Sequence, residues 1–118
     1  MKPGRIPPRA TITNSPPDDV SDVLRRFGNN LRTARLRRRL RIQDIADRIG
    51  ASRSTVTNVE NGKPGVSGAA YFGVLWSLGL LGDADSLADP DRDEEGKTRQ
   101  LARLPSQAPR LQPLRDDF

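Results

Sequence analysis

Apolar residues recur at helical spacing in four stretches along the middle of the chain. In the first, over residues 20–34, they lie three and four positions apart, which predicts a helix ending near Arg39. Gly28-Asn29-Asn30 is the weakest point of this helix, because glycine and asparagine are poor helix formers. Ser15 and Asp18 stand where an N-cap and a capping-box acid would begin it.

Two short helices are predicted next, joined by a tight turn. The first has an apolar face made of Ile42, Ile45, Ala46 and Ile49. Gly50 suits the left-handed conformation that ends a helix, and Ser52 offers an N-cap oxygen to the second. Only Val56 and Val59 are large and apolar in that second helix, so its other face is polar. A short polar helix held by an apolar one is the arrangement that reads a DNA groove.

A fourth helix is predicted after Ser67, its expected N-cap, with an apolar face made of Ala70, Val74, Leu75 and Leu78. Tyr71, Phe72 and Trp76 add bulk on both flanks of this face. Core packing is the favoured interpretation of the three aromatic residues, and a dimer surface is the alternative. Residues 86–89 are expected to form one further turn, and no substantial β-sheet is predicted.

Composition divides the 118 residues into a folded middle and two tails. Residues 1–15 are basic and contain prolines, so we expect a disordered tail or an arm that follows DNA phosphates. Residues 16–82 hold the four helical patterns and form the predicted domain. Residues 83–118 are acidic at first, with seven acids between Asp83 and Glu95, and then basic and proline-containing. We expect this second tail to be disordered as well.

The charge of the chain favours an anionic partner. Its formal net charge is +5 and its pI is near 10.7. Eight arginines and no acid lie between Arg25 and Arg41. This run is interpreted either as a solvated helix face or as a surface close to phosphate groups, which would relieve the repulsion between the like charges.

Several functional classes are excluded by what the sequence lacks. Without cysteine or histidine it has no disulfide framework, no common zinc ligand set and no histidine-based catalytic triad. It has no G-x-x-x-x-G-K-[ST] phosphate loop. Its longest apolar run, about 11 residues over 71–81, is shorter than the roughly 20 residues of a membrane span. The expectation is a cytoplasmic, non-catalytic protein without cofactor, metal or membrane contact.

Three blocks of sequence, at matching spacing, resemble a helix-turn-helix domain of the Xre/phage-repressor type. The blocks are Leu31-Arg32-x-Ala34-Arg35, Asp44-Ile45-Ala46-Asp47-Arg48-Ile49-Gly50-x-Ser52 and Ser54-Thr55-Val56-x-x-Val59-Glu60-Asn61-Gly62. The resemblance covers about residues 27–80 and implies an all-α, five-helix, lambda-repressor-like fold. Shorter motifs, which include Pro64-Gly65-Val66-Ser67 and Arg103-Leu104-Pro105, are similar to those of HipB-like antitoxins, the partners of HipA-type kinases.

The resemblance also implies roles for individual residues. Base reading in the major groove is implied for Arg53, Ser54, Thr57 and Asn58. Contacts with the DNA backbone are implied for Arg38, Arg41, Gln43, Ser52, Asn61 and Lys63. A structural ion pair is implied between Arg35 and Glu60. One position departs from the family pattern: Ile42 stands where a glutamine usually holds a phosphate, so Arg41 is the expected replacement.

The sequence therefore predicts a repressor that binds a palindromic operator in double-stranded DNA as a homodimer. Following the resemblance, we expect it to be the antitoxin of a type II toxin–antitoxin system, to bind a HipA-like kinase toxin and to repress its own operon. Two alternatives stay open. One is a stand-alone prophage-type or metabolic regulator without a toxin. The other is an interaction adaptor that has lost DNA binding, which Ile42 favours and Arg53 and Asn58 oppose.

Overall fold

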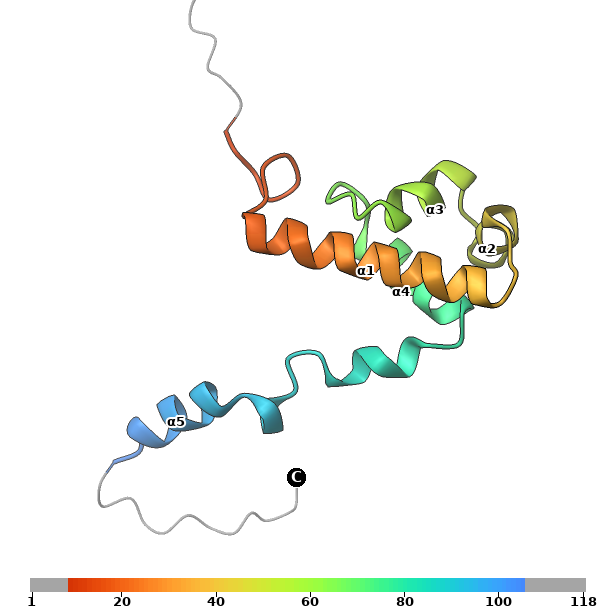
Figure 1. The fold of residues 1–118 in the computed structure, drawn as a ribbon. Coiled ribbons are helices and arrows are strands. Elements are labelled where there is room, and N and C mark those ends of the chain that lie inside the picture. Colours follow the sequence, from red (N-terminus) through yellow and green to blue (C-terminus); the bar gives the residue numbers. More distant parts are fainter. Residues whose placement is uncertain (1–8, 106–118) are drawn as a thin grey trace, which may run out of the picture. The chain divides into compact units, whose positions relative to one another are not determined.

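The computed structural model describes residues 9–105, which form helices and no strand (Figure 1). The all-α prediction is confirmed. The chain divides into two compact units, with the boundary after Gly82. The first contains α1 (Asp18–Arg37), α2 (Ile42–Ile49), α3 (Arg53–Glu60) and α4 (Gly68–Ser77). After Leu80 follow η1 (Leu81–Ser86), η2 (Pro90–Arg92) and α5 (Glu94–Ala102). The predicted disordered tails fall partly on residues 1–8 and 106–118, which lie outside the described residues.

The start of α1 differs from the prediction. Its N-cap is Pro17, with φ −54° and ψ 148°, and no side chain caps the helix. The predicted cap at Ser15 is wrong because that residue closes an earlier turn, in which its N–H donates to the carbonyl of Thr11 at 2.8 Å. Asp18 and Asp19 lie in the first turn instead, where their charges favour the positive end of the helix dipole.

Helix α1 continues through Gly28, where the sequence had indicated its weakest point. A Cβ at Gly28 would lie 2.5 Å from the carbonyl oxygen of Val59 and 2.6 Å from that of Glu60. At Gly62, which has φ +71°, a Cβ would lie 2.7 Å from the Cα of Arg25. We call this pair of close backbone approaches, at Gly28 and Gly62, the glycine seam. It lets α1 lie directly against the C-terminal end of α3.

The core of the first unit lies between its four α-helices. Its buried apolar side chains are Leu31, Ile45, Ala46, Val56, Val59, Tyr71, Val74, Leu75 and Leu78. The inward faces predicted for the second and third helices are therefore confirmed, with Ile42 and Ile49 partly exposed at their edge. The predicted helix ends are confirmed too: Gly50 has φ +69°, and Ser52 and Ser67 each accept an N-cap hydrogen bond.

The aromatic residues of α4 have different environments. Tyr71 is buried and stacks on Phe27 with ring centroids 5.5 Å apart. Its hydroxyl group donates a hydrogen bond to the carbonyl of Lys63 at 2.8 Å. Burial raises the pKa of the Tyr71 phenol above its usual value. The ring of Phe72 is tilted by 49° against that of Phe27, but Phe72 stays 37% exposed, and Trp76 is 57% exposed. The prediction of core packing is thus confirmed for Tyr71. It is wrong for Trp76, whose side chain is exposed in the single chain.

The second unit is built from local contacts. The predicted turn at residues 86–89 is confirmed, since the N–H of Asp89 donates to the carbonyl of Ser86 at 3.2 Å. Helix α5 was not predicted, because this region was interpreted as a tail. Asp93 caps α5, and Arg99 pairs with Glu95 at 2.6 Å. No residue is buried in η1, η2 or α5, so these elements lack a core of their own.

Candidate nucleic-acid interface

Helix α3 presents a polar face to solvent. Its exposed side chains include Arg53, Ser54, Thr57 and Asn58, the four predicted base readers. Their spacing of one and four residues places them on one side of the helix. Within residues 9–105 none of the four side chains makes a hydrogen bond or ion pair, so the donors and acceptors of this face are available to a ligand.

The opposite face of α3 is anchored in the core. Val56 and Val59 are fully buried, and α3 packs against α1, α2 and α4. At the C-terminal end of α3, Glu60 accepts two hydrogen bonds from Arg35 of α1, at 2.7 and 3.0 Å. The hydrogen bond that Arg35 donates to Glu60 is the main reason that the pKa of Arg35 is raised above its ordinary value. The third contact of Arg35, to the carbonyl of Leu40 at 2.9 Å, also fixes the loop after α1.

Two side chains near the start of α2 that were predicted to contact phosphates, those of Arg41 and Gln43, form hydrogen bonds with acidic neighbours. The guanidinium of Arg41 lies 2.9 Å from Asp44, whose carboxylate also accepts the backbone N–H of Arg41 at 2.7 Å. This contact lowers the pKa of Asp44 and raises that of Arg41. Gln43 donates to Asp47 at 2.7 Å. The side chain of Arg41 does not cap α2, and the Asp44 carboxylate instead accepts the backbone N–H at this end of the helix. A phosphate would have to compete with a carboxylate for the side chains of Arg41 and Gln43.

The other predicted backbone-contacting residues lie at the ends of helices. Arg38 donates to the carbonyl of Ala34 at 2.9 Å, at the end of α1. Ser52 caps the start of α3 by accepting the N–H of Thr55 at 3.0 Å. Asn61 and Lys63 follow the C-terminal end of α3 and are exposed. The structure therefore brings Ser52, Asn61 and Lys63 to the two ends of the polar face, while Arg38 belongs to the α1–α2 connection.

Sequence reasoning missed residues that position α2 and α3. Arg48 donates to the carbonyl of Ser77 at 3.1 Å, which joins the last turn of α2 to the end of α4. Gly28 was interpreted only as a weak helix former, although its missing side chain permits the contact with α3. A glycine in the middle of an otherwise continuous helical pattern is the signal that points to such a close approach.

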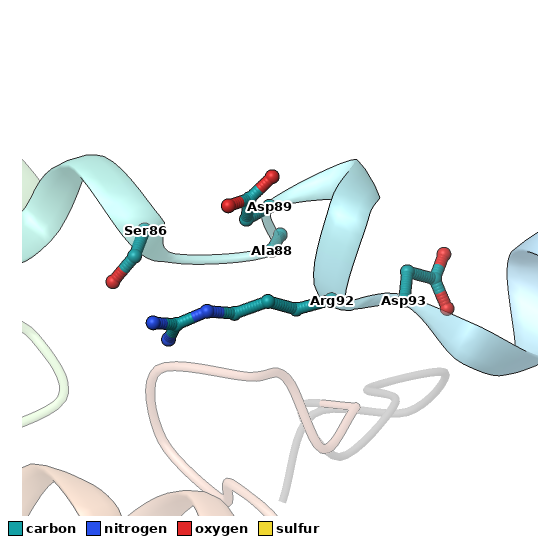
Figure 2. A pocket seen from close by; sticks show the side chains of 5 residues that line it. All are labelled: Ser86, Ala88, Asp89, Arg92 and Asp93. Carbon is teal, nitrogen blue, oxygen red and sulfur yellow. The ribbon is translucent and has the colours of Figure 1, made fainter.

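The second unit contains an open hollow of about 440 Å³ (Figure 2). It is lined by Ser86, Ala88, Asp89, Arg92 and Asp93. Figure 2 shows the Arg92 side chain extended toward Ser86. Asp89 and Asp93 use carboxylate oxygens as caps, each accepting a backbone N–H at 2.9 Å. Among residues 9–105 there is no group of three or more side chains that could hold a metal ion.

No helix in the described part of the chain has the length and apolar character needed to cross a membrane.

The matched family model agrees with this geometry. Residues 26–75 match the model described as a helix-turn-helix domain, a stretch that begins within α1, contains α2 and α3, and ends within α4. Comparison with curated proteins found no match, and comparison with solved structures found none. A domain of this kind indicates a DNA-binding regulator. Residues 26–75, fewer than half of the chain, are thus similar to a helix-turn-helix domain.

Proposed function

We propose that the chain is a sequence-specific transcriptional repressor that binds a palindromic operator as a homodimer. The observation that carries this proposal is the outward face of α3, whose polar side chains are exposed while its inner face is anchored. The guanidinium of Arg53 can donate two hydrogen bonds to O6 and N7 of guanine. The side-chain amide of Asn58 can form two hydrogen bonds with N6 and N7 of adenine. Bound across a promoter, such a dimer would exclude RNA polymerase.

Affinity in this proposal comes mainly from contacts with phosphates. Arg38, Arg41 and Lys63 are exposed and carry positive charge close to the ends of helices. Gln43, Ser52 and Asn61 add uncharged donors, and these would position the domain without reading sequence. Because each phosphate contact releases counterions, operator binding should weaken steeply as the salt concentration rises.

The test begins with selection of a preferred site from random duplex DNA. Wild type, Arg53→Ala and Arg99→Ala are then titrated against that site and against a scrambled duplex. Arg53→Ala should lose roughly 1–3 kcal/mol of discrimination. Arg99→Ala is the matched control, since Arg99 is exposed in the second unit and pairs with Glu95. Unchanged sequence preference in Arg53→Ala would contradict the reading role of α3.

Within this function we assign the chain the role of antitoxin to a HipA-like kinase toxin, with repression of its own operon. Two observations support the assignment. The motifs that resemble HipB-like antitoxins extend past the helix-turn-helix into residues 64–105. The second unit also exposes apolar side chains without a core of its own: Leu87 is 64% exposed and Leu101 is 67% exposed. A kinase surface would cover these leucines.

Co-expression of the chain with a HipA-like kinase from the same genome tests this assignment. The full chain should co-purify with the kinase and inhibit its phosphoryl transfer. A chain without residues 97–118 should lose the kinase and keep operator binding, since α1 to α4 remain. Operator binding without any kinase partner would instead support the stand-alone regulator. If site selection recovers no preferred sequence, the adaptor alternative, favoured by Ile42 at the usual glutamine position, replaces the repressor.

A further inference from the structure

Helix α4 has an apolar character on the side that solvent reaches as well as on the side that faces the core. From Gly68 to Ser77 it contains no charged residue. Tyr71, Val74 and Leu75 are buried, whereas Phe72 and Trp76 point outward and are 37% and 57% exposed. Helices that are apolar all round are normally buried on all sides. The outward side of α4 therefore has the composition of a covered surface.

This apolar surface continues from α4 onto α1. The rings of Phe72 and Phe27 have centroids 6.1 Å apart, and Val23, one helical turn before Phe27, is 55% exposed. Together Val23, Phe72 and Trp76 expose roughly 300 Å² of apolar area, the size of the largest patch on a typical monomer. A standard interface buries about 800 Å² per partner, so this patch fits the centre of an interface with a polar rim.

We propose that α4 pairs with α4 of a second copy of the chain, antiparallel, about a two-fold axis that passes between Phe72 and Gly73. The inference rests on the proposed function, which requires a homodimer, and it names the surface that forms it. A two-fold interface must be complementary to itself, because the same patch serves both copies. The exposed side of α4 meets this requirement because its large and small side chains are spaced so that a large one in each copy lies over a small one in the other.

The complementarity follows from the spacing of large and small residues. Ala69 and Trp76 lie equally far from the midpoint between Phe72 and Gly73. Antiparallel pairing about that midpoint therefore places Trp76 of each copy over Ala69 of the other, a large side chain against a small one. Phe72 meets its counterpart close to the axis.

A second copy fits this surface better than an unrelated partner for two reasons. The match between Trp76 and Ala69 is contained within one helix and is used twice by symmetry. The exposed side of α4 also carries no charge with which a different partner would be selected. Pairing through α4 uses none of the side chains proposed to contact DNA, so the outward face of α3 stays accessible in the dimer.

The association can be followed without a label, because Trp76 is the only tryptophan of the chain. Wild type should sediment as a dimer at micromolar concentration, and its fluorescence emission should shift to longer wavelength on dilution. Trp76→Glu should raise the dimer dissociation constant about 30-fold or more, the effect expected for an anchoring tryptophan. Leu36→Glu is the matched control: Leu36 is 49% exposed on α1, and this variant should remain dimeric. Circular dichroism verifies that both variants are folded.

A charge-pairing experiment tests the register. Ala69→Arg and Trp76→Glu should each associate weakly alone, whereas a mixture of the two should form a heterodimer in which the introduced charges face each other. A dimer unaffected by Trp76→Glu, or a mixture that forms no heterodimer, overturns the α4 interface. If operator binding persists in that case, the homodimeric repressor stands and only its surface is wrong. A wild type that neither associates nor selects an operator overturns both.

Discussion

Glu60 and Arg35 form a buried, two-pronged ion pair between the last residue of α3 and the last turn of α1. The N–O distances are 2.7 and 3.0 Å, and the two side chains are only 4% and 9% exposed. The pair fixes one end of α3 to the longest helix of the domain.

Removal of one partner should therefore be costly. Glu60→Ala leaves the Arg35 charge buried and unpaired, so we expect the free energy of unfolding to fall by about 3–5 kcal/mol. The double variant Arg35→Met/Glu60→Leu removes both charges and should recover part of that loss. Urea denaturation of wild type and the variants measures the difference. A double variant no more stable than Glu60→Ala would contradict the account.

The glycine seam makes a separate prediction for stability. Gly28→Ala places a Cβ 2.5 Å from the backbone oxygen of Val59, and backbone atoms yield less readily than a side chain. We expect a loss of about 1–3 kcal/mol from overpacking, despite the higher helix propensity of alanine. Gly68→Ala is the control, because a Cβ there meets nothing within 4 Å. Equal thermal stability of the two variants would show that the glycine seam can accommodate a Cβ at position 28.

The contact between Arg41 and Asp44 predicts a pH dependence. The pKa of Asp44 is lowered in the folded chain, mainly by the hydrogen bond from Arg41. Asp44 therefore stabilises the fold at pH values above its unfolded-state pKa, and this contribution is lost as the pH falls through the lower folded-state pKa. The stability difference between wild type and Asp44→Asn, measured by urea unfolding, should be constant near neutrality and shrink in acid. A difference that persists at the lowest pH would assign the effect to another cause.

Arg41 also predicts a change in the salt dependence of DNA binding. If its guanidinium exchanges Asp44 for a phosphate on binding, Arg41→Ala should lower the salt slope of operator affinity by about 0.9, the value for one phosphate contact. The loss of affinity should be the same on specific and scrambled duplexes. Arg41→Lys keeps the charge and should keep the slope. An unchanged slope in Arg41→Ala would leave the guanidinium with Asp44 in the complex.

Local signals explain why the central helices were predictable. Ser52 and Ser67 cap their helices as predicted, and Gly50 adopts the left-handed conformation, because each signal acts within a few residues of the chain. The Arg35–Glu60 contact spans 25 positions and entered the sequence analysis only through a family resemblance.

Other features depended on information that local patterns do not carry. Gly28 is explained only by the backbone of a distant helix. The exposure of Trp76 could not be predicted, since periodicity does not tell which side of an all-apolar helix faces the core. Helix α5 was missed because its stability comes from the Asp93 cap and from pairs such as Glu95 with Arg99, which leave no apolar stripe.

The way α3 is held has a consequence for engineering the domain. Its angle is set by the backbone contacts of the glycine seam and by buried side chains, whereas its four outward side chains make no hydrogen bond or ion pair within residues 9–105. The proposed base readers and the buried positions are thus separate sets of residues on one short helix. A library that varies residues 53, 54, 57 and 58 together should yield folded members at high frequency, and operator preference could be reprogrammed without rebuilding the scaffold.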